Sequence, residues 1–110
     1  MSGEDGIRLL LEQDGPYAFR ISFEGAGLDA LHTDESTPLG AGAGPTPSHL
    51  LLAGIANCLS ASLLFALRKF KNAPGLIRTE IVADKVRNAA GRWRIPRAEV
   101  VIRLSGAATG

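Results

Sequence analysis

The longest uncharged stretch of the chain runs from Leu50 to Leu67 and predicts a single long helix. Its apolar residues lie nearly all the way round that helix, which is typical of a helix covered on most sides. Before this stretch, Thr46 suits the N-cap and Pro47 suits the first helical position. The basic residues that suit the negative end of a helix come after it: Arg68, Lys69 and Lys71. We therefore expect a helix that begins at Pro47 and ends before the turn residues 72–75.

Strand patterns lie on both sides of the predicted helix. Residues 17–24 alternate apolar and polar side chains, which predicts a strand with one face toward a core. Shorter apolar stretches predict further strands at 7–12, 28–33, 76–87 and 92–104. The order strand, strand, strand, helix, strand, strand predicts an α+β fold, in which a mostly antiparallel sheet carries one long central helix.

A helix that is apolar on all sides needs more cover than five short strands provide. Either a second chain covers the remaining sides, or a C-terminal part of the natural protein does. Gly54, Cys58 and Ser62 share one stripe of the helix, where small side chains allow another backbone to approach closely. A membrane span is an alternative by length alone. The polar residues within the helix and the strands beside it favour a central helix in a globular core.

Length and composition narrow the class of protein. We expect one domain, residues 1–110, because 110 residues suit a single core. Lys and Arg number 12 against 11 for Asp and Glu, and aromatic residues make up 5%, so the sequence offers neither a basic field nor a stacking platform for nucleic acid. A single cysteine cannot form an internal disulfide, and the first residues lack a signal-peptide pattern. These features predict a cytoplasmic protein that is not bound to a membrane.

The glycine-rich stretch 39–45 enters the predicted helix directly, as a phosphate-binding loop does. No Gly-Lys-Ser/Thr follows it, and its glycine spacing fits no dinucleotide fingerprint. The sequence therefore favours a plain loop and predicts no cofactor. Metal binding is also disfavoured, because one cysteine and the scattered His32 and His49 supply too few ligands.

Two motifs on either side of the glycine-rich stretch resemble the OsmC/Ohr family, the osmotically induced and organic hydroperoxide resistance proteins. They are Leu31-His32-Thr33-Asp34-Glu35 and the segment from Gly44-Pro45-Thr46-Pro47-Ser48-His49 to Asn57-Cys58. The resemblance continues through the end of the helix and the hairpin 77–104, so it spans most of the chain. It places Cys58 at the first cysteine of the family, eleven positions after Pro47. The closest match is to OsmC-like members of unassigned function.

The resemblance implies an intertwined homodimer with long central helices and sites at the subunit interface. In active members of the family, the first cysteine is a peroxidatic thiolate that attacks an organic hydroperoxide. A second cysteine captures the resulting sulfenic acid, and a dithiol reduces the disulfide. An arginine lowers the pKa of the thiolate, and a glutamate holds that arginine.

This sequence departs from the family pattern at three points. Ser48 and His49 occupy the two positions at one of which the glutamate is expected, and the loss of that residue also removes half of a capping box. No second cysteine is present, so we expect the chain to lack the C-terminal helix–strand part in which the family carries it. No motif assigns the arginine: Arg20 is the first choice, and Arg92 and Arg94, which flank Trp93, are alternatives.

Two functions follow for Cys58. A lone cysteine in an apolar helix is either a small core residue or a reactive thiol. A reactive thiol predicts a peroxidase that reduces organic hydroperoxides through Cys58 in oxidative stress defence, with an external thiol as reductant and Arg20 as the activating residue. An inert thiol predicts a non-catalytic dimer that binds a small apolar ligand or is purely structural. A dyad of Cys58 with His49 within one chain is disfavoured, since the two lie on different sides of the helix.

Overall fold

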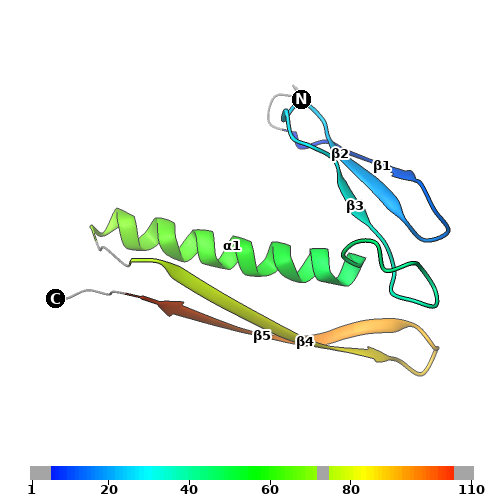
Figure 1. Cartoon of the computed structure of the whole chain (residues 1–110). Coiled ribbons are helices and arrows are strands. Elements are labelled where there is room, and N and C mark those ends of the chain that lie inside the picture. Colours follow the sequence, from blue (N-terminus) through cyan, green and yellow to red (C-terminus); the bar gives the residue numbers. More distant parts are fainter. Residues whose placement is uncertain (1–5, 72–74, 106–110) are drawn as a thin grey trace. The chain divides into compact units, whose positions relative to one another are not determined.

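The computed structural model describes residues 6–71 and 75–105 and contains five strands and one helix among them (Figure 1). In chain order these are β1 (Leu9–Gln13), β2 (Phe19–Phe23), β3 (Leu31–Thr33), α1 (Pro47–Lys69), β4 (Ile77–Arg87) and β5 (Trp93–Leu104). The predicted α+β order is confirmed, and each element lies within a few residues of its predicted range. The chain divides into two compact units, Met1–Leu50 and Leu51–Gly110, which we describe separately.

The first unit contains a three-stranded antiparallel sheet in the order β1-β2-β3. The turn between β1 and β2 is closed by a hydrogen bond from the N–H of Asp14 to the carbonyl of Ala18 at 3.0 Å. The apolar side of β2 is covered unevenly, because Ile21 is 8% exposed whereas Phe19 is 38% exposed. The alternation predicted for this strand is therefore correct, but within the chain only its centre is buried.

The second unit contains the antiparallel β4–β5 hairpin and most of α1. The hairpin turns at 88–91, where the N–H of Asn88 donates to the carbonyl of Arg92 at 2.8 Å and Gly91 has a φ of 77°, a conformation that glycine adopts without strain. The register shifts between Asp84 and Val86, at a bulge. The five strands thus form two sheets, whereas the sequence suggested one, because no ladder joins the three-stranded sheet to this hairpin in the described residues.

Helix α1 has no buried residue. On its side toward β4, the Ser60 hydroxyl donates to the carbonyl of Ala56 at 2.7 Å and lies 2.5 Å from the Thr79 hydroxyl. Large apolar side chains elsewhere along α1 are open, including Leu51 at 56% and Phe65 at 71% exposure. The expected burial of this helix is therefore not provided by the chain itself.

At Gly54, the first residue of the stripe of small residues on α1, the described part of the chain leaves open space. A Cβ added at Gly54 would have no heavy atom within 4 Å. By length and composition alone α1 is also apolar enough to cross a membrane, a test that the core helices of soluble proteins pass as well. Helix α1 is therefore long and apolar, and none of its residues is buried by the described residues.

Candidate functional site

The entry to α1 is held by a reciprocal pair of hydrogen bonds. The Thr46 hydroxyl accepts from the N–H of His49 at 3.2 Å, and Nδ1 of His49 accepts from the N–H of Thr46 at 3.0 Å. This is the geometry of a capping box, with His49 at the third helical position in place of glutamate or glutamine. The expectation that the box is half lost was wrong, because a neutral imidazole nitrogen is also a hydrogen-bond acceptor.

The loop before α1 is organised around the carboxylate of Asp34, which is only 3% exposed. That carboxylate accepts from the N–H groups of Glu35 at 2.7 Å, Ala41 at 3.1 Å and Ala43 at 3.2 Å. The N–H of Ala43 contributes most to lowering the pKa of Asp34; burial opposes it, and the N–H groups of Glu35 and Ala41 lower the pKa further. Asp34 therefore ties the two ends of this loop together as an anion.

The same contacts decide whether the glycine-rich loop can cradle a phosphate. The N–H groups of Ala41 and Ala43 already donate to Asp34, so both are engaged, and a second anion beside this carboxylate would be repelled. Two glycines are needed for close packing, since a Cβ at Gly40 would overlap Asp34 and one at Gly44 would overlap the His32 carbonyl. The loop is a structural support for the helix entry, as the sequence favoured.

Cys58 lies near the middle of α1 and its side chain is exposed. Of its polar neighbours, Ser60 is bonded to Ala56 and to Thr79, which is a structural role. A solvent-exposed sulfur is accessible to a peroxide and to a reducing thiol, whereas a buried one would be inert. Within the chain, access to Cys58 is therefore open.

An open, mostly apolar groove of about 360 Å³ runs between α1 and β4. Its walls come from both elements: Ala56, Asn57, Ser60, Ala61 and Leu64 of α1, and Ile77 and Thr79 of β4. The paired hydroxyls of Ser60 and Thr79 and the side chain of Asn57 are the polar groups along it. A second open groove, of about 630 Å³, follows α1 from Ala61 to Lys69. Apolar walls with a few polar groups are typical of sites for small apolar ligands.

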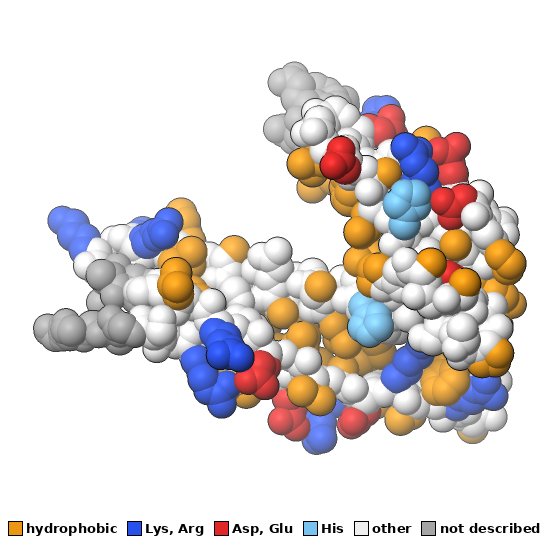
Figure 2. Space-filling model, viewed as in Figure 1, with side chains coloured by type: hydrophobic (Ala, Val, Ile, Leu, Met, Phe, Trp, Pro, Cys, Tyr) orange, Lys and Arg blue, Asp and Glu red, His pale blue; other side chains and the backbone are white. Residues whose placement is uncertain are grey.

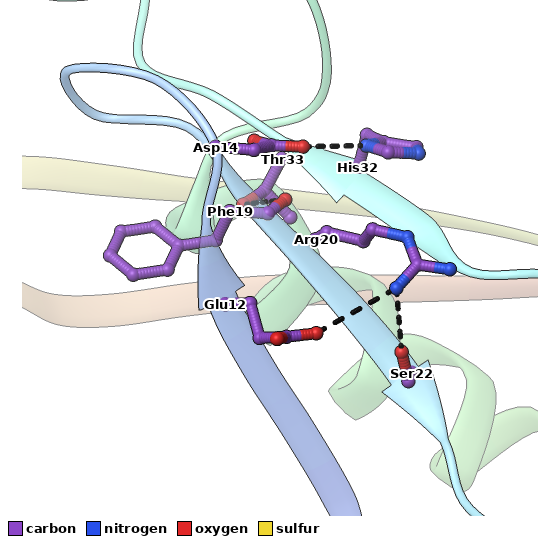
Figure 3. A network of polar contacts seen from close by, with 7 residues as sticks. All are labelled: Glu12, Asp14, Phe19, Arg20, Ser22, His32 and Thr33. Carbon is purple, nitrogen blue, oxygen red and sulfur yellow. Dashed lines mark hydrogen bonds and ion pairs between the residues drawn. The ribbon is translucent and has the colours of Figure 1, made fainter.

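Arg20 lies on the polar side of β2 and is already paired (Figure 3). Its Nη1 is 3.7 Å from a carboxylate oxygen of Glu12, which is the cross-strand partner of Arg20 in the sheet, and it donates to the Ser22 hydroxyl at 3.4 Å. About half of the Arg20 side chain (48%) remains exposed. Beside this pair, Nδ1 of His32 is 3.3 Å from Asp14. A carboxylate thus holds the candidate arginine, although neither Ser48 nor His49 can.

The predicted site residues are divided between the two units. Arg20, Ser48 and His49 belong to the first unit, and Cys58 belongs to the second. Ser48 is half-buried in the first turn of α1, and His49 is used by the cap. The pairing of Arg20 with Cys58 therefore stays a prediction.

The alternative arginines flank an aromatic residue at the turn end of the hairpin. Arg94 donates from Nη1 to the carbonyl of Trp93 at 2.9 Å. Trp93 is 52% exposed. In residues 6–71 and 75–105, no group of three His, Cys, Asp or Glu side chains is placed to hold a metal ion.

We compared the chain with known protein families, curated proteins and solved structures. No family model matches the chain, and no curated protein matches it. It is similar to a solved structure described as an osmotic stress induced and detoxification response protein, from Psychrobacter arcticus, with a TM-score of 0.78 and 15% sequence identity over 99% of this chain and 76% of that one. An OsmC-like protein of unknown function from Vibrio cholerae gives a TM-score of 0.76 and 15% identity over 100% of this chain and 80% of that one.

The chain has the OsmC-like fold. The fold expected from the sequence motifs is thereby confirmed over the whole length of the chain. At 15% identity the likeness concerns the fold and does not transfer an activity.

Sequence reasoning missed three of the contacts in this OsmC-like fold. The Thr46-x-x-His49 spacing was visible as a capping box only if histidine is admitted at its last position. Glu12 was the predictable partner of Arg20, because a hairpin turn at 14–16 places the two residues opposite each other. No local pattern indicated the role of Asp34, since its donors Ala41 and Ala43 are seven and nine residues away.

Proposed function

We propose that this chain is a cytoplasmic member of the OsmC family that reduces organic hydroperoxides through Cys58 as a homodimer, with an external thiol as reductant. The observation that carries the proposal is an exposed cysteine in the middle of the long helix of an OsmC-like fold. The motif spacing from Pro47 to Cys58 supports it independently of the fold.

The chemistry needs one cysteine and two external thiols. The Cys58 thiolate attacks the terminal oxygen of the hydroperoxide, an S–O bond forms as the O–O bond breaks, and the alkoxide takes a proton from water to leave as an alcohol. An external thiol then attacks the sulfur of the sulfenic acid, so that a mixed disulfide forms and water leaves. A second external thiol attacks the sulfur of the first reductant in this mixed disulfide, so that the Cys58 thiolate leaves and the disulfide of the two reductants is released.

Arg20 is the residue that we assign to stabilising the thiolate in this proposal. A guanidinium beside the sulfur favours its charged form. The Glu12 pair supports this assignment, because it orients Arg20 while 48% of its side chain stays accessible. Glu12 then takes the place of the glutamate that is missing at Ser48 and His49.

The test is the reaction of the purified chain with cumene hydroperoxide, followed by intact-mass spectrometry. We expect Cys58 to gain one oxygen, or an adduct with an added thiol, and Cys58→Ser to gain neither. Arg20→Ala should slow the reaction by at least about tenfold, whereas Arg8→Ala, a change of the same kind at the other arginine of the first unit, should not. An unreactive Cys58 in the folded protein refutes the catalytic proposal.

The groove between α1 and β4 favours a second candidate function. In this alternative, the protein is a non-catalytic dimer that binds a small apolar ligand, with Cys58 inert. The apolar walls and the Ser60–Thr79 hydroxyl pair support it. Saturable binding of a fluorescent fatty acid that is abolished by Ala61→Trp, together with an unreactive Cys58, would favour this function over catalysis.

A further inference from the structure

The reaction proposed for Cys58 needs an external thiol, because this chain has only one cysteine. That thiol has to reach the sulfur along the open side of α1. Beyond Cys58, the residues Ala61, Phe65 and Lys69 follow at intervals of one or two helical turns, which places all four along one face of the helix. The helix itself therefore fixes how the sulfur is placed relative to this face.

The open groove of about 630 Å³ on α1 begins one turn beyond Cys58. Ala61, Leu64 and Phe65 are its apolar walls, and Phe65 is 71% exposed. Arg68 and Lys69 line its far end. Figure 2 shows Lys and Arg side chains in blue beside hydrophobic side chains in orange at the left of the view, where Figure 1 draws the last turn of α1. Such a groove is complementary to a molecule with an apolar arm and an anionic end.

The charges of Arg68 and Lys69 are available to such a molecule. In the described ranges 6–71 and 75–105, neither of the two has an ion pair. The three acidic residues of the second unit are already paired with arginines of the hairpin: Asp84 and Glu99 with Arg97, and Glu80 with Arg103. The C-terminal end of a helix carries only about half a negative charge, so two full positive charges leave an excess there.

The helix also sets the length of the arm. From Cys58 to Arg68 and Lys69, the axis of α1 rises by about 15 to 16 Å, at about 1.5 Å per residue. The long basic side chains lean back toward the N-terminus of the helix, which shortens the gap to the sulfur. An arm of about ten to twelve carbon atoms spans a gap of this size. A thiol on such an arm therefore reaches Cys58 while its anionic end contacts Arg68 and Lys69.

We infer that the reductant of Cys58 is a thiol with an anionic group at the far end of an apolar arm, and that Arg68 and Lys69 bind this group. The inference rests on the proposed function and names the chemical class of its reductant. The bound thiolate attacks the sulfur of the Cys58 sulfenic acid, an S–S bond forms, and the hydroxide takes a proton from solvent and leaves as water. A second reductant thiolate attacks the reductant sulfur of this mixed disulfide, and the Cys58 thiolate leaves. Binding of the anionic group holds the thiol close to the oxidised sulfur, which speeds the first step.

The test compares three thiols on the full chain after cumene hydroperoxide has oxidised Cys58. Mercaptoundecanoate has the long arm and the carboxylate, mercaptoundecanol has the same arm without the charge, and mercaptopropionate has the charge without the arm. Intact-mass spectrometry of quenched samples gives the rate at which each thiol forms a mixed disulfide with Cys58. We expect mercaptoundecanoate to react about tenfold or more faster than either of the others, because it alone contacts the groove and both cations.

Two double variants separate this site from the general positive charge of the second unit. Arg68→Ala with Lys69→Ala should abolish the preference for mercaptoundecanoate over mercaptoundecanol. Lys85→Ala with Arg87→Ala removes the same charge from β4, beside Trp93, and is the matched control that should keep the preference. An equal fall of the preference in both double variants would contradict the inference, because it would mean that only the net charge of the unit matters.

The outcomes distinguish this inference from the proposed function. Equal rates for mercaptoundecanoate and mercaptoundecanol overturn the inference and leave the peroxidase proposal intact, since Cys58 has been oxidised in that assay. A Cys58 that cumene hydroperoxide does not oxidise overturns both. The preference of the wild-type chain for the carboxylate should also fall as NaCl is raised from about 50 mM to about 500 mM, because exposed cations are screened over that range. A preference that does not change with salt overturns the inference, and this titration decides even if a variant proves unfolded by circular dichroism.

Discussion

The capping pair at the entry to α1 gives a quantitative prediction that concerns the local structure alone. Thr46 is 9% exposed and joins His49 by two backbone–side-chain hydrogen bonds, at 3.2 Å and 3.0 Å. Replacing a threonine cap by alanine costs about 1 kcal/mol, within a range of about 0.5–2 kcal/mol. Removing the imidazole acceptor costs about 0.5–1.5 kcal/mol, the net value of one intramolecular hydrogen bond. We therefore expect Thr46→Ala and His49→Ala each to lower the free energy of unfolding by about 1 kcal/mol.

The reciprocal geometry predicts that the two losses are not additive. Because the Thr46 hydroxyl also lies 3.2 Å from Nδ1 of His49, either single substitution already removes this side-chain contact, and the double variant should be more stable than the sum of the single effects by about 0.5 kcal/mol or more. His49→Gln and His49→Glu retain an acceptor at the third helical position and should remain near wild type. His49→Glu also restores a carboxylate at one of the two positions where the OsmC/Ohr pattern has one.

Urea unfolding followed by far-UV circular dichroism is the assay, and thermal unfolding should show a shift of about 4–8 °C for each kcal/mol. Thr46→Ser is the matched control for the hydroxyl, since it retains the cap and loses only a methyl group. The reasoning is refuted if His49→Ala unfolds at the wild-type urea concentration, or if the double variant shows strictly additive losses. The first result would mean that the imidazole makes no bond to the helix entry in solution, and the second that the two side chains act independently.

Three further predictions concern the loop and the hairpin. N–H donors, chiefly that of Ala43, hold the pKa of Asp34 below 3.8, so the contribution of this carboxylate to stability should be complete from neutral pH down to about 3.8 and be lost as the pH falls through the lowered pKa. Asp34→Asn should therefore be less stable than the wild type at pH 7, and the difference in stability should disappear in acid unfolding. Gly44→Ala should unfold at a lower temperature than the wild type, because the added Cβ would overlap a backbone carbonyl. Gly54→Ala, whose Cβ meets open space, should be about 1 kcal/mol more stable than the wild type. Equal melting temperatures of the two variants would contradict the reasoning. Ser60→Ala should lower the free energy of unfolding by about 1 kcal/mol, because it removes the partner of the Thr79 hydroxyl. In urea unfolding, the double variant with Thr79→Val should recover part of that loss. A further loss in the double variant would be evidence against the hydroxyl pair.

The uncovered sides of α1 are central to the function as well as to the fold. The uncharged helix indicated that something must cover it, and the structure shows that the described residues of one chain do not. Cover by a second copy would bring a second set of side chains close to Cys58. The proposed pairing of Arg20 with Cys58 is therefore tested in the dimer.

Local sequence determined the elements of this protein. The alternation in 17–24 and the threonine and proline before an uncharged stretch predicted β2 and the start of α1 correctly, because each signal acts over a few neighbouring residues. The motif around Cys58 indicated the OsmC-like fold, which the solved structures confirm.

Tertiary structure decided which polar groups meet. The Asp34 carboxylate reaches amides seven and nine residues away, so no local pattern indicated these contacts. The pairing of Arg20 with Glu12 follows only from the register of the β1–β2 pair. The imidazole of His49 replaced a carboxylate in the cap because the backbone N–H of Thr46 requires an acceptor in the right place and does not require a charge. The pattern of apolar and polar residues therefore specified where the helix and strands lie, whereas the geometry of the folded chain specified which groups each side chain binds.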